Sequence, residues 1–221
     1  RFLERLQAVD RVVFLSSGGT VYGAPGVRRP FREHDTSAIP ISPYGMTKLA
    51  IEQYLAFAAL TFNFDYMILR PSNPVGPWAK PNAAQGFVSV LLENHLCGRT
   101  THIWGDGGTV RDYLDVRDLV NAIISACMQE KLGGEVFNVG SGVGRSINEV
   151  IALVQKTLDL DLAVEIAEGR GVDVPYNVLD CSHIEERLGW RASRDFGRAV
   201  LDTWAFLCKS HQKPMSAGVS D

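Results

Sequence analysis

The order of apolar and polar segments in the first third of the chain constrains the fold most strongly. An apolar run at 12–15, Val-Val-Phe-Leu, has no polar alternation, which is typical of a short strand buried on both faces of a parallel sheet. A helix over 42–62 is predicted next, because Ser42 is a favourable N-cap and Pro43 suits the first helical position. A second apolar run lies at 66–69. Strand, loop, helix and strand in this order predict a βαβ unit of an open α/β sheet.

The elements expected after about residue 74 are shorter and alternate more tightly. They are helices at 86–97, 116–130, 147–158 and 196–209 and strands at 102–104 and 135–139. We therefore interpret 1–73 as part of a first domain that interleaves with the later chain, 74–210 as mainly a smaller lobe, and 211–221 as a flexible tail.

Charge and hydropathy exclude several function classes. Twenty-two Lys and Arg against twenty-five Asp and Glu give a net charge of −3, without the basic footprint of a nucleic-acid or anionic-membrane partner. The apolar stretch 119–128 contains Asn121 and Ser125 and is shorter than the ~20 residues of a membrane-spanning helix. The four cysteines form no C-x-x-C pair, and we recognise no signal peptide. We therefore expect a small-molecule or protein partner, no nucleic acid, no membrane segment and a reducing, cytoplasmic setting.

Tyr44 and Lys48 are candidate catalytic residues. They are four residues apart, which places both side chains on one helix face within one turn. An ammonium group beside a phenol favours the phenolate, the form in which tyrosine acts as a base. The segment 16–23, Ser-Ser-Gly-Gly-Thr-Val-Tyr-Gly, supplies hydroxyl groups at the carboxyl end of the first strand, the edge where open α/β sheets bind ligands. The alternative is an ordinary surface pair, and the adjoining loop favours the functional interpretation.

A glycine-rich segment at 140–144 resembles a dinucleotide-binding loop but fails the pattern. Arg145 stands where G-x-G-x-x-G requires its last glycine. Ser146 and Glu149 form the S-x-x-E capping box, which explains the start of the following helix without a phosphate. We interpret this segment as structural.

Several segments in order resemble the extended short-chain dehydrogenase/reductase family, most closely its UDP-glucose 4-epimerase type of nucleotide-sugar enzyme. They are 16–23, 42–49, 70–77, 104–107, 110–113, 137–140 and 170–175. The resemblance extends from about Arg11 to Lys209, and the ordered set is more specific than any single motif.

The resemblance implies a partial Rossmann-type doubly wound parallel sheet with a smaller α/β substrate-binding lobe and NAD as the cofactor. Residues 1–73 would be the carboxyl-terminal half of the NAD-binding domain. A glycine-rich phosphate loop and the first strands of the sheet are expected before Arg1, on the order of a hundred residues at roughly 30 per βαβ unit. We therefore expect these 221 residues to be part of a longer enzyme, and to be inactive and bind NAD weakly by themselves.

The resemblance also implies roles for residues of the first loop and helix. Tyr44 would be the general base that removes the proton from a sugar hydroxyl, and Lys48 would bind the nicotinamide ribose and favour the phenolate. Gly18 stands where the family most often has Ser or Thr, so Ser17 or Thr20 would supply an assisting hydroxyl, with Ser17 favoured. The expected cofactor contacts are Ser16, Ser17, Tyr44, Lys48 and Pro71.

Five residues match substrate-binding positions of the family. Asn73 would bind the diphosphate of a nucleotide sugar, and Arg111 and Arg170 would clasp it with their forked, permanently charged donors. Asp173 would accept a hydrogen bond from the nucleotide ribose, and Trp104 would line the uracil pocket. The alternatives are a surface ion pair of the first arginine with neighbouring aspartates and a core position for the tryptophan.

The reaction implied is 4-epimerisation of a nucleotide sugar: UDP-glucose, UDP-galactose or an N-acetyl analogue. Tyr44 takes the C4 hydroxyl proton as hydride passes to NAD, the keto sugar turns over, and hydride returns to its opposite face. Asn177 stands where some relatives have a bulkier tyrosine, which favours room for an N-acetyl group. A homodimer through the helix at 44–62 is implied as well, and we assign no residue to a metal.

Two alternatives to epimerisation stay open. One is a 4,6-dehydratase or reductase of the same family, although dehydratases place an Asp-Glu pair where this chain has Gly19 and Thr20. The other is a non-catalytic protein that binds a nucleotide sugar or NAD, which Gly18 favours.

Overall fold

The two apolar runs near the start of the chain form adjacent strands of a parallel sheet. A computed structural model describes residues 9–24, 26, 28–35, 40–78, 86–131, 133–169 and 174–211. Strands β1 (Arg11–Leu15), β2 (Asp65–Pro71) and β6 (Glu135–Val139) lie in the order β1-β2-β6, all parallel. The last strand comes from the later chain, as the predicted interleaving requires.

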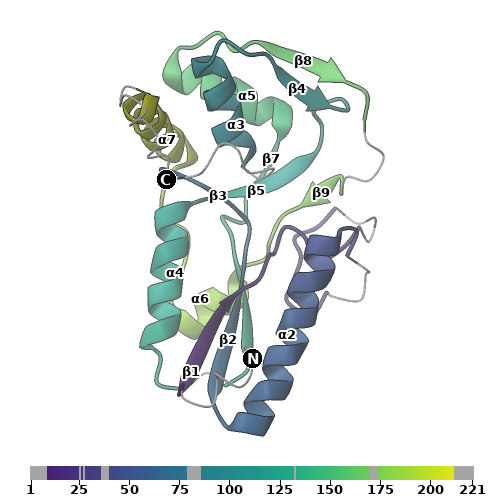
Figure 1. Ribbon diagram of the computed structural model, residues 1–221, viewed down its shortest axis with the longest axis vertical. Helices are drawn as coiled ribbons and strands as arrows, with labels where there is room; N and C mark the ends of the chain where they lie inside the picture. The colour runs from purple at the N-terminus through teal and green to yellow at the C-terminus, as the bar shows by residue number, and fades with distance from the viewer. Residues whose placement is uncertain are drawn as a thin grey trace, which may run out of the picture.

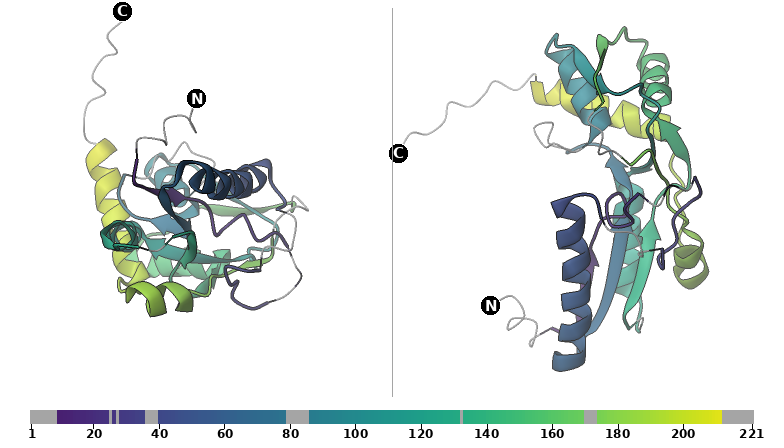
Figure 2. Two further views of the ribbon diagram at one scale, coloured as in Figure 1. Left: turned by 90° about the horizontal axis from the view of Figure 1, so that it is seen from below. Right: turned by 90° about the vertical axis from the view of Figure 1, so that its right-hand side faces the viewer.

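Helices cover both faces of this sheet (Figures 1 and 2). Alternate residues of β2 point to opposite faces. Ile68 packs with Leu55 and Ala58 of α2 (Pro43–Phe62), whereas Met67 packs with α4 (Val116–Met128) and α6 (Ser182–Leu188). The carboxyl ends of the strands therefore form an edge between two helical layers, where the first loop emerges.

Local chemistry sets the start of α2 as the sequence predicts. The Ser42 side chain accepts a hydrogen bond from the Gly45 backbone N–H, and Pro43 occupies the first turn. At the other end Asn63 takes a left-handed conformation, φ 56°, and its N–H donates to the Ala59 carbonyl. Because α2 begins beside the sheet edge, its first turn carries Tyr44 to that edge.

The remaining elements form a second group at the other end of the long axis (Figure 1). Strand β5 (Val110–Asp115) is parallel to β3 (Asn73–Val75) and β9 (Tyr176–Asn177) and antiparallel to β7 (Gly144–Ser146). A separate pair is formed by β4 (Thr101–Trp104) and β8 (Val164–Ala167). Helices α3 (Phe87–Leu96), α5 (Ile147–Leu158) and α7 (Phe196–His211) surround the apolar core of this group.

The α/β class with a parallel sheet is confirmed, and so is each of the longer predicted elements. The predicted burial of strand 12–15 on both faces is wrong. Leu15 is 38% exposed and the rest of β1 is half-buried, because β1 pairs only with β2 in the described part of the chain. The predicted helix 116–130 ends two residues early. The domain division stays a prediction, and 212–221 of the predicted tail lie outside the described residues.

The glycine-rich segment 140–144 holds a buried carboxylate of the protein itself. The backbone N–H groups of Ser141 and Gly142 donate to Asp112, and the Ser141 hydroxyl donates to it as well. A Cβ at Gly140 would lie 2.4 Å from Asp112 Oδ2. Burial raises the pKa of Asp112, although these hydrogen bonds oppose the rise. The segment thus has a structural role, and the predicted capping box from Ser146 to Glu149 is confirmed.

Candidate active site

Lys48 lies between Tyr44 and the end of β1. Its Nζ donates to the Leu15 carbonyl at 2.7 Å and lies 5.6 Å from the centre of the Tyr44 ring. The Phe14 ring centre lies 5.0 Å from the same nitrogen. Tyr44 is 42% exposed, so its phenol is open to a ligand. The predicted juxtaposition of an amine and a phenol at the carboxyl end of a parallel strand is present.

Gly45 lets the first turn of α2 lie directly against the first loop. A Cβ at this position would come within 2.5 Å of the Thr20 carbonyl oxygen and 3.1 Å of Pro40 Cβ. At Gly45, next to Tyr44, the backbone of α2 therefore contacts the backbone of the first loop. It fixes how closely the tyrosine approaches the loop that carries the candidate hydroxyl groups.

No side chain fits at Gly18. A Cβ there would lie 2.6 Å from Leu179 Cδ1 and 2.8 Å from the Arg70 carbonyl oxygen. This packing explains the glycine at a position where serine or threonine was expected. The hydroxyl groups left on either side belong to Ser17 and Thr20, and Thr20 Oγ1 is buried without a hydrogen-bond partner. This unpartnered hydroxyl favours Thr20 as the assisting group, whereas the sequence favoured Ser17.

Ser16 and Pro71 lie at adjacent strand ends. The Ser16 hydroxyl is buried and donates to Glu52, so a cofactor contact from this residue would use its backbone. The Pro71 carbonyl accepts from the Gly18 N–H at 2.8 Å, which joins the first loop to the end of β2. Their predicted contacts with a cofactor stay predictions.

A cavity of about 350 Å³ brings three predicted substrate residues together. Asn73 comes from β3, Trp104 from β4 and Arg111 from β5. Arg111 Nη1 donates to the carbonyls of Val110 and Val174, which hold its guanidinium in place. Trp104 is 45% exposed, so the alternative of a core position is wrong.

Asn73 lies between this cavity and the first loop. Its Nδ2 donates to the Asp112 carbonyl at 2.8 Å, and its Oδ1 lies near Gly19. Tyr44 and Lys48 are not among the residues that line the cavity. The described part of the chain thus contains the candidate catalytic pair and a candidate binding cavity, with Asn73 between them.

Two predicted substrate residues, Arg170 and Asp173, lie outside the described residues. Asn177 is buried at 1% exposure, and its Nδ2 donates to the Gly18 carbonyl at 3.1 Å. Its Oδ1 is buried and has no hydrogen-bond partner. Asn177 therefore holds the first loop in place through its hydrogen bond to Gly18.

The sequence analysis missed two buried charges beneath the loop, Glu52 and Arg70. Glu52 follows Lys48 by one helical turn, so the four-residue spacing already placed it on the same face as Tyr44. Arg70 lies at the end of β2 and forms an ion pair with Glu52, and both side chains are less than 5% exposed. The helical spacing was the available signal, whereas the pairing required the fold.

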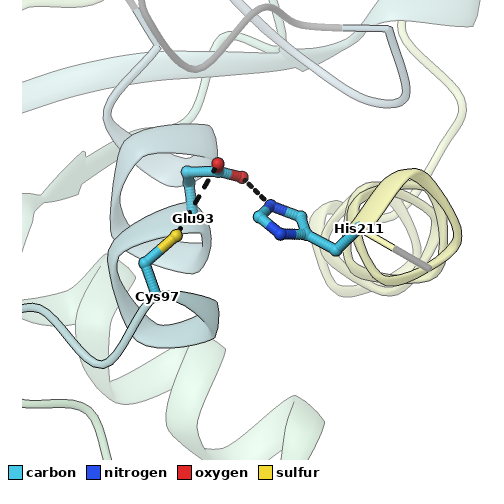
Figure 3. Close-up of side chains that lie close together, drawn as sticks. All are labelled: Glu93, Cys97 and His211. Atoms are coloured by element: carbon cyan, nitrogen blue, oxygen red, sulfur yellow. Dashed lines mark hydrogen bonds and ion pairs between the residues drawn. The ribbon is translucent and has the colours of Figure 1, made fainter. Parts of the chain in front are cut away.

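A group of potential metal ligands lies elsewhere, between α3 and the end of α7 (Figure 3). His211 Nε2 and Glu93 Oε2 are 2.9 Å apart, and Cys97 Sγ lies 4.0 Å from Glu93 Oε1. These donor types suit zinc. Both oxygens of Glu93 are engaged by its neighbours, so the three residues are also explained as a contact between two helices.

Comparison with known proteins identifies the family. The profile of the NAD dependent epimerase/dehydratase family matches residues 2–140. The chain is 35% identical over 208 residues to UDP-glucose 4-epimerase of Mycolicibacterium smegmatis, covering 94% of this chain and 66% of that protein. The Yersinia pestis UDP-glucose 4-epimerase is 35% identical over 232 residues, covering 95% and 67%. The chain thus spans about two thirds of the length of these relatives.

Solved structures give the same result for the fold. UDP-glucose 4-epimerase of Thermotoga maritima with UDP-glucose has a TM-score of 0.87 at 34% identity, covering 95% of this chain and 68% of that one. The Thermus thermophilus UDP-glucose 4-epimerase in complex with NAD has a TM-score of 0.83 at 30% identity, covering 93% and 67%. No helix in the described ranges is long and apolar enough to cross a membrane. The match over more than half of the sequence, together with this fold, shows that the chain belongs to the NAD dependent epimerase/dehydratase family.

Proposed function

We propose that the protein containing this chain is an NAD-dependent nucleotide-sugar 4-epimerase acting on UDP-glucose, UDP-galactose or an N-acetyl analogue. The observation that carries the proposal is the Lys48 amine, bonded to the end of β1 and 5.6 Å from the Tyr44 ring centre. The cavity lined by Asn73, Trp104 and Arg111 adds a place for the nucleotide. The names of the UDP-glucose 4-epimerase relatives agree with this assignment.

The residues present fit a nicotinamide nucleotide at this edge of the sheet. A Cβ at Gly19 would meet nothing closer than 3.9 Å, which leaves open space beside the loop, and Thr20 Oγ1 is an unpartnered donor there. Lys48 would hold the nicotinamide ribose, and Pro71 would contact the ring through its backbone. When bound, NAD supplies the acceptor and donor of hydride that a 4-epimerisation requires.

The chain's own residues move the proton and hold the substrate. Tyr44 removes the C4 hydroxyl proton and returns it after the keto sugar has turned over. Thr20 or Ser17 hydrogen-bonds the same oxygen. Arg111 binds the diphosphate, for which its planar guanidinium is suited, and Trp104 stacks on the base.

Replacement of Tyr44 tests the proposal. In the full-length protein, Tyr44→Phe removes the base and lowers kcat for interconversion of UDP-glucose and UDP-galactose by roughly 10²–10⁴-fold. Tyr66→Phe at the start of β2, at the end of the sheet opposite Tyr44, is the matched control and leaves kcat unchanged. The assay is a coupled measurement of UDP-galactose consumption. Undiminished turnover in Tyr44→Phe would show that Tyr44 is not the catalytic base.

Other members of the family provide the main rival. Escherichia coli dTDP-4-dehydro-6-deoxyglucose reductase is 32% identical over 183 residues, which favours a reductase as the second candidate. A reductase consumes NAD(P)H stoichiometrically, whereas an epimerase does not, so product analysis without added reductant separates them. A dehydratase is disfavoured by Gly19 and Thr20 in place of an acid pair. A non-catalytic protein would bind the nucleotide sugar without converting it.

We further propose a homodimer through α2 and a cytoplasmic setting. The outer face of α2 carries large exposed apolar side chains: Tyr54, Phe57 and Leu60. Such a face supports an interface with a second copy. The four cysteines are free, which suits a reducing compartment. Asn177 is buried and does not line the cavity, so its small size does not bear on the N-acetyl group.

A further inference from the structure

Helix α2 is attached to the end of β1 at two points, one turn apart. Lys48 donates to the carbonyl of Leu15. Glu52, one turn later, accepts a hydrogen bond from the hydroxyl of Ser16. Leu15, the last residue of β1, and Ser16, the first residue after it, are thus bound by two consecutive turns of the helix that carries Tyr44. The second attachment lies outside the residues to which a catalytic role is assigned above.

Arg70 extends this attachment to the second strand. Its Nε and Nη2 donate to the two Glu52 oxygens at 3.0 and 2.5 Å, a bidentate arrangement. Its Nη1 donates to the Tyr22 hydroxyl at 3.1 Å and to the Glu33 carbonyl at 2.8 Å. Tyr22 in turn donates to Asn138. One polar network therefore joins α2, the first loop and the ends of β1, β2 and β6.

A contribution to the stability of the fold does not explain why Glu52 and Arg70 are buried. Among the ion pairs of the described residues, Glu52–Arg70 is the one whose two side chains are both below 5% exposed, at 3% and 4%. Burying two charges costs about as much as their attraction returns, and apolar replacements of similar size are often neutral or stabilising. A bidentate pair does, however, fix an orientation, because its geometry tolerates little rotation.

Resting on the proposed epimerase function, we propose that Glu52 and Arg70 are positioning residues that hold the first turn of α2, and with it the Tyr44 phenol, in register with the first loop. Tyr44 is eight residues from Glu52, or about 12 Å along the helix. A tilt of about 5° at Glu52 would displace the phenol by about 1 Å, and a displacement of that size can lower a rate by about 10²-fold.

The test uses the full-length protein with two variants and one control. Glu52→Gln removes the charge with little change in shape, and the double variant Glu52→Leu with Arg70→Met replaces the pair by apolar side chains. The control is Asp65→Asn, which breaks the Arg11–Asp65 ion pair at the opposite end of the same two strands. For each protein kcat, KM, the melting temperature and bound NAD are measured.

If Glu52 and Arg70 are positioning residues, the two variants change kcat but not KM. Both variants lose about 10²-fold in kcat while KM for the nucleotide sugar stays within about threefold. The double variant melts at or above the wild-type temperature. Asp65→Asn lowers the melting temperature but leaves kcat within about twofold. Wild-type kcat in the double variant, or an equal loss of kcat in the control, would overturn the inference.

A second measurement separates this inference from the proposed function. Hydrogen exchange of the backbone amides at 46–48 needs no turnover, and it is expected to be faster in both variants than in Asp65→Asn. If the wild-type protein does not epimerise, the proposed function fails and hydrogen exchange still decides whether the pair orders the helix. Unchanged protection in both variants would refute the positioning role by itself.

Discussion

Gly45→Ala tests whether the contact between α2 and the first loop sets the geometry of the site. The added Cβ would lie 2.5 Å from the Thr20 carbonyl oxygen, so the two backbones must separate by roughly 0.9 Å to reach ordinary contact near 3.4 Å. Alanine in a helix gains about 1 kcal/mol over glycine, whereas overpacking typically costs about 1–3 kcal/mol. The difference is a net loss of about 0–2 kcal/mol, and we expect its upper half because the obstructing atom belongs to the backbone and cannot rotate away.

The effect on turnover should exceed the effect on stability. A separation of that size at the residue beside Tyr44 is expected to lower kcat by about 10²-fold. Urea unfolding and the epimerisation assay on the full-length protein measure the two effects. Gly133→Ala in the turn before β6, at the opposite end of the sheet, is the control, since its Cβ would meet nothing closer than 3.4 Å. A Gly45→Ala protein that is more stable than wild type and turns over normally would mean that the loop yields freely and does not position the helix.

The remaining predictions concern substrate binding and pH. Arg111→Lys keeps the positive charge but loses the forked guanidinium donors. KM for the nucleotide sugar should therefore rise about tenfold, with kcat little changed. The control Arg99→Lys, at an exposed position after α3, should change neither KM nor kcat. Hydrogen bonds from Arg29 lower the pKa of Asp35 from 3.8 to about 2. A carboxyl group whose pKa is lower in the folded than in the unfolded protein stabilises the folded state at pH values above its unfolded-state pKa. This stabilisation is lost as the pH falls through the folded-state pKa. Urea midpoints between pH 5 and pH 2 should therefore fall less steeply in an Arg29→Met variant, and an unchanged slope would contradict the assignment.

Local chemistry made parts of the fold predictable from the sequence. The Ser42 cap and the Ser146 to Glu149 capping box each satisfy free N–H groups through residues three apart, so no distant contact is needed to start those helices. The pairing of Tyr44 with Lys48 was predictable for the same reason, since helical spacing alone brings them together.

Features that depend on long-range contacts were not predictable in this way. Strands β7 and β9 have three and two residues, too few for a period to be recognised, and they exist because β5 offers them hydrogen bonds. The Glu52–Arg70 pair joins a helix to a strand 18 residues away and leaves no pattern that distinguishes it from surface charges. The half-burial of β1 likewise reflects its neighbours in the sheet.

The glycine at position 18 shows how the two parts of the molecule depend on each other. Leu179 fills the space that a side chain at 18 would need, and Asn177 donates to the carbonyl of the same glycine. Both residues belong to a segment about 160 positions later in the chain, and Asn177 lies on β9 beside Arg111. The segment that supports the first loop therefore pairs with β5, the strand that carries Arg111 into the cavity wall. A change in β5 or β9 is expected to reach the hydroxyl groups of the first loop through packing, because a close-packed interior transmits such displacements.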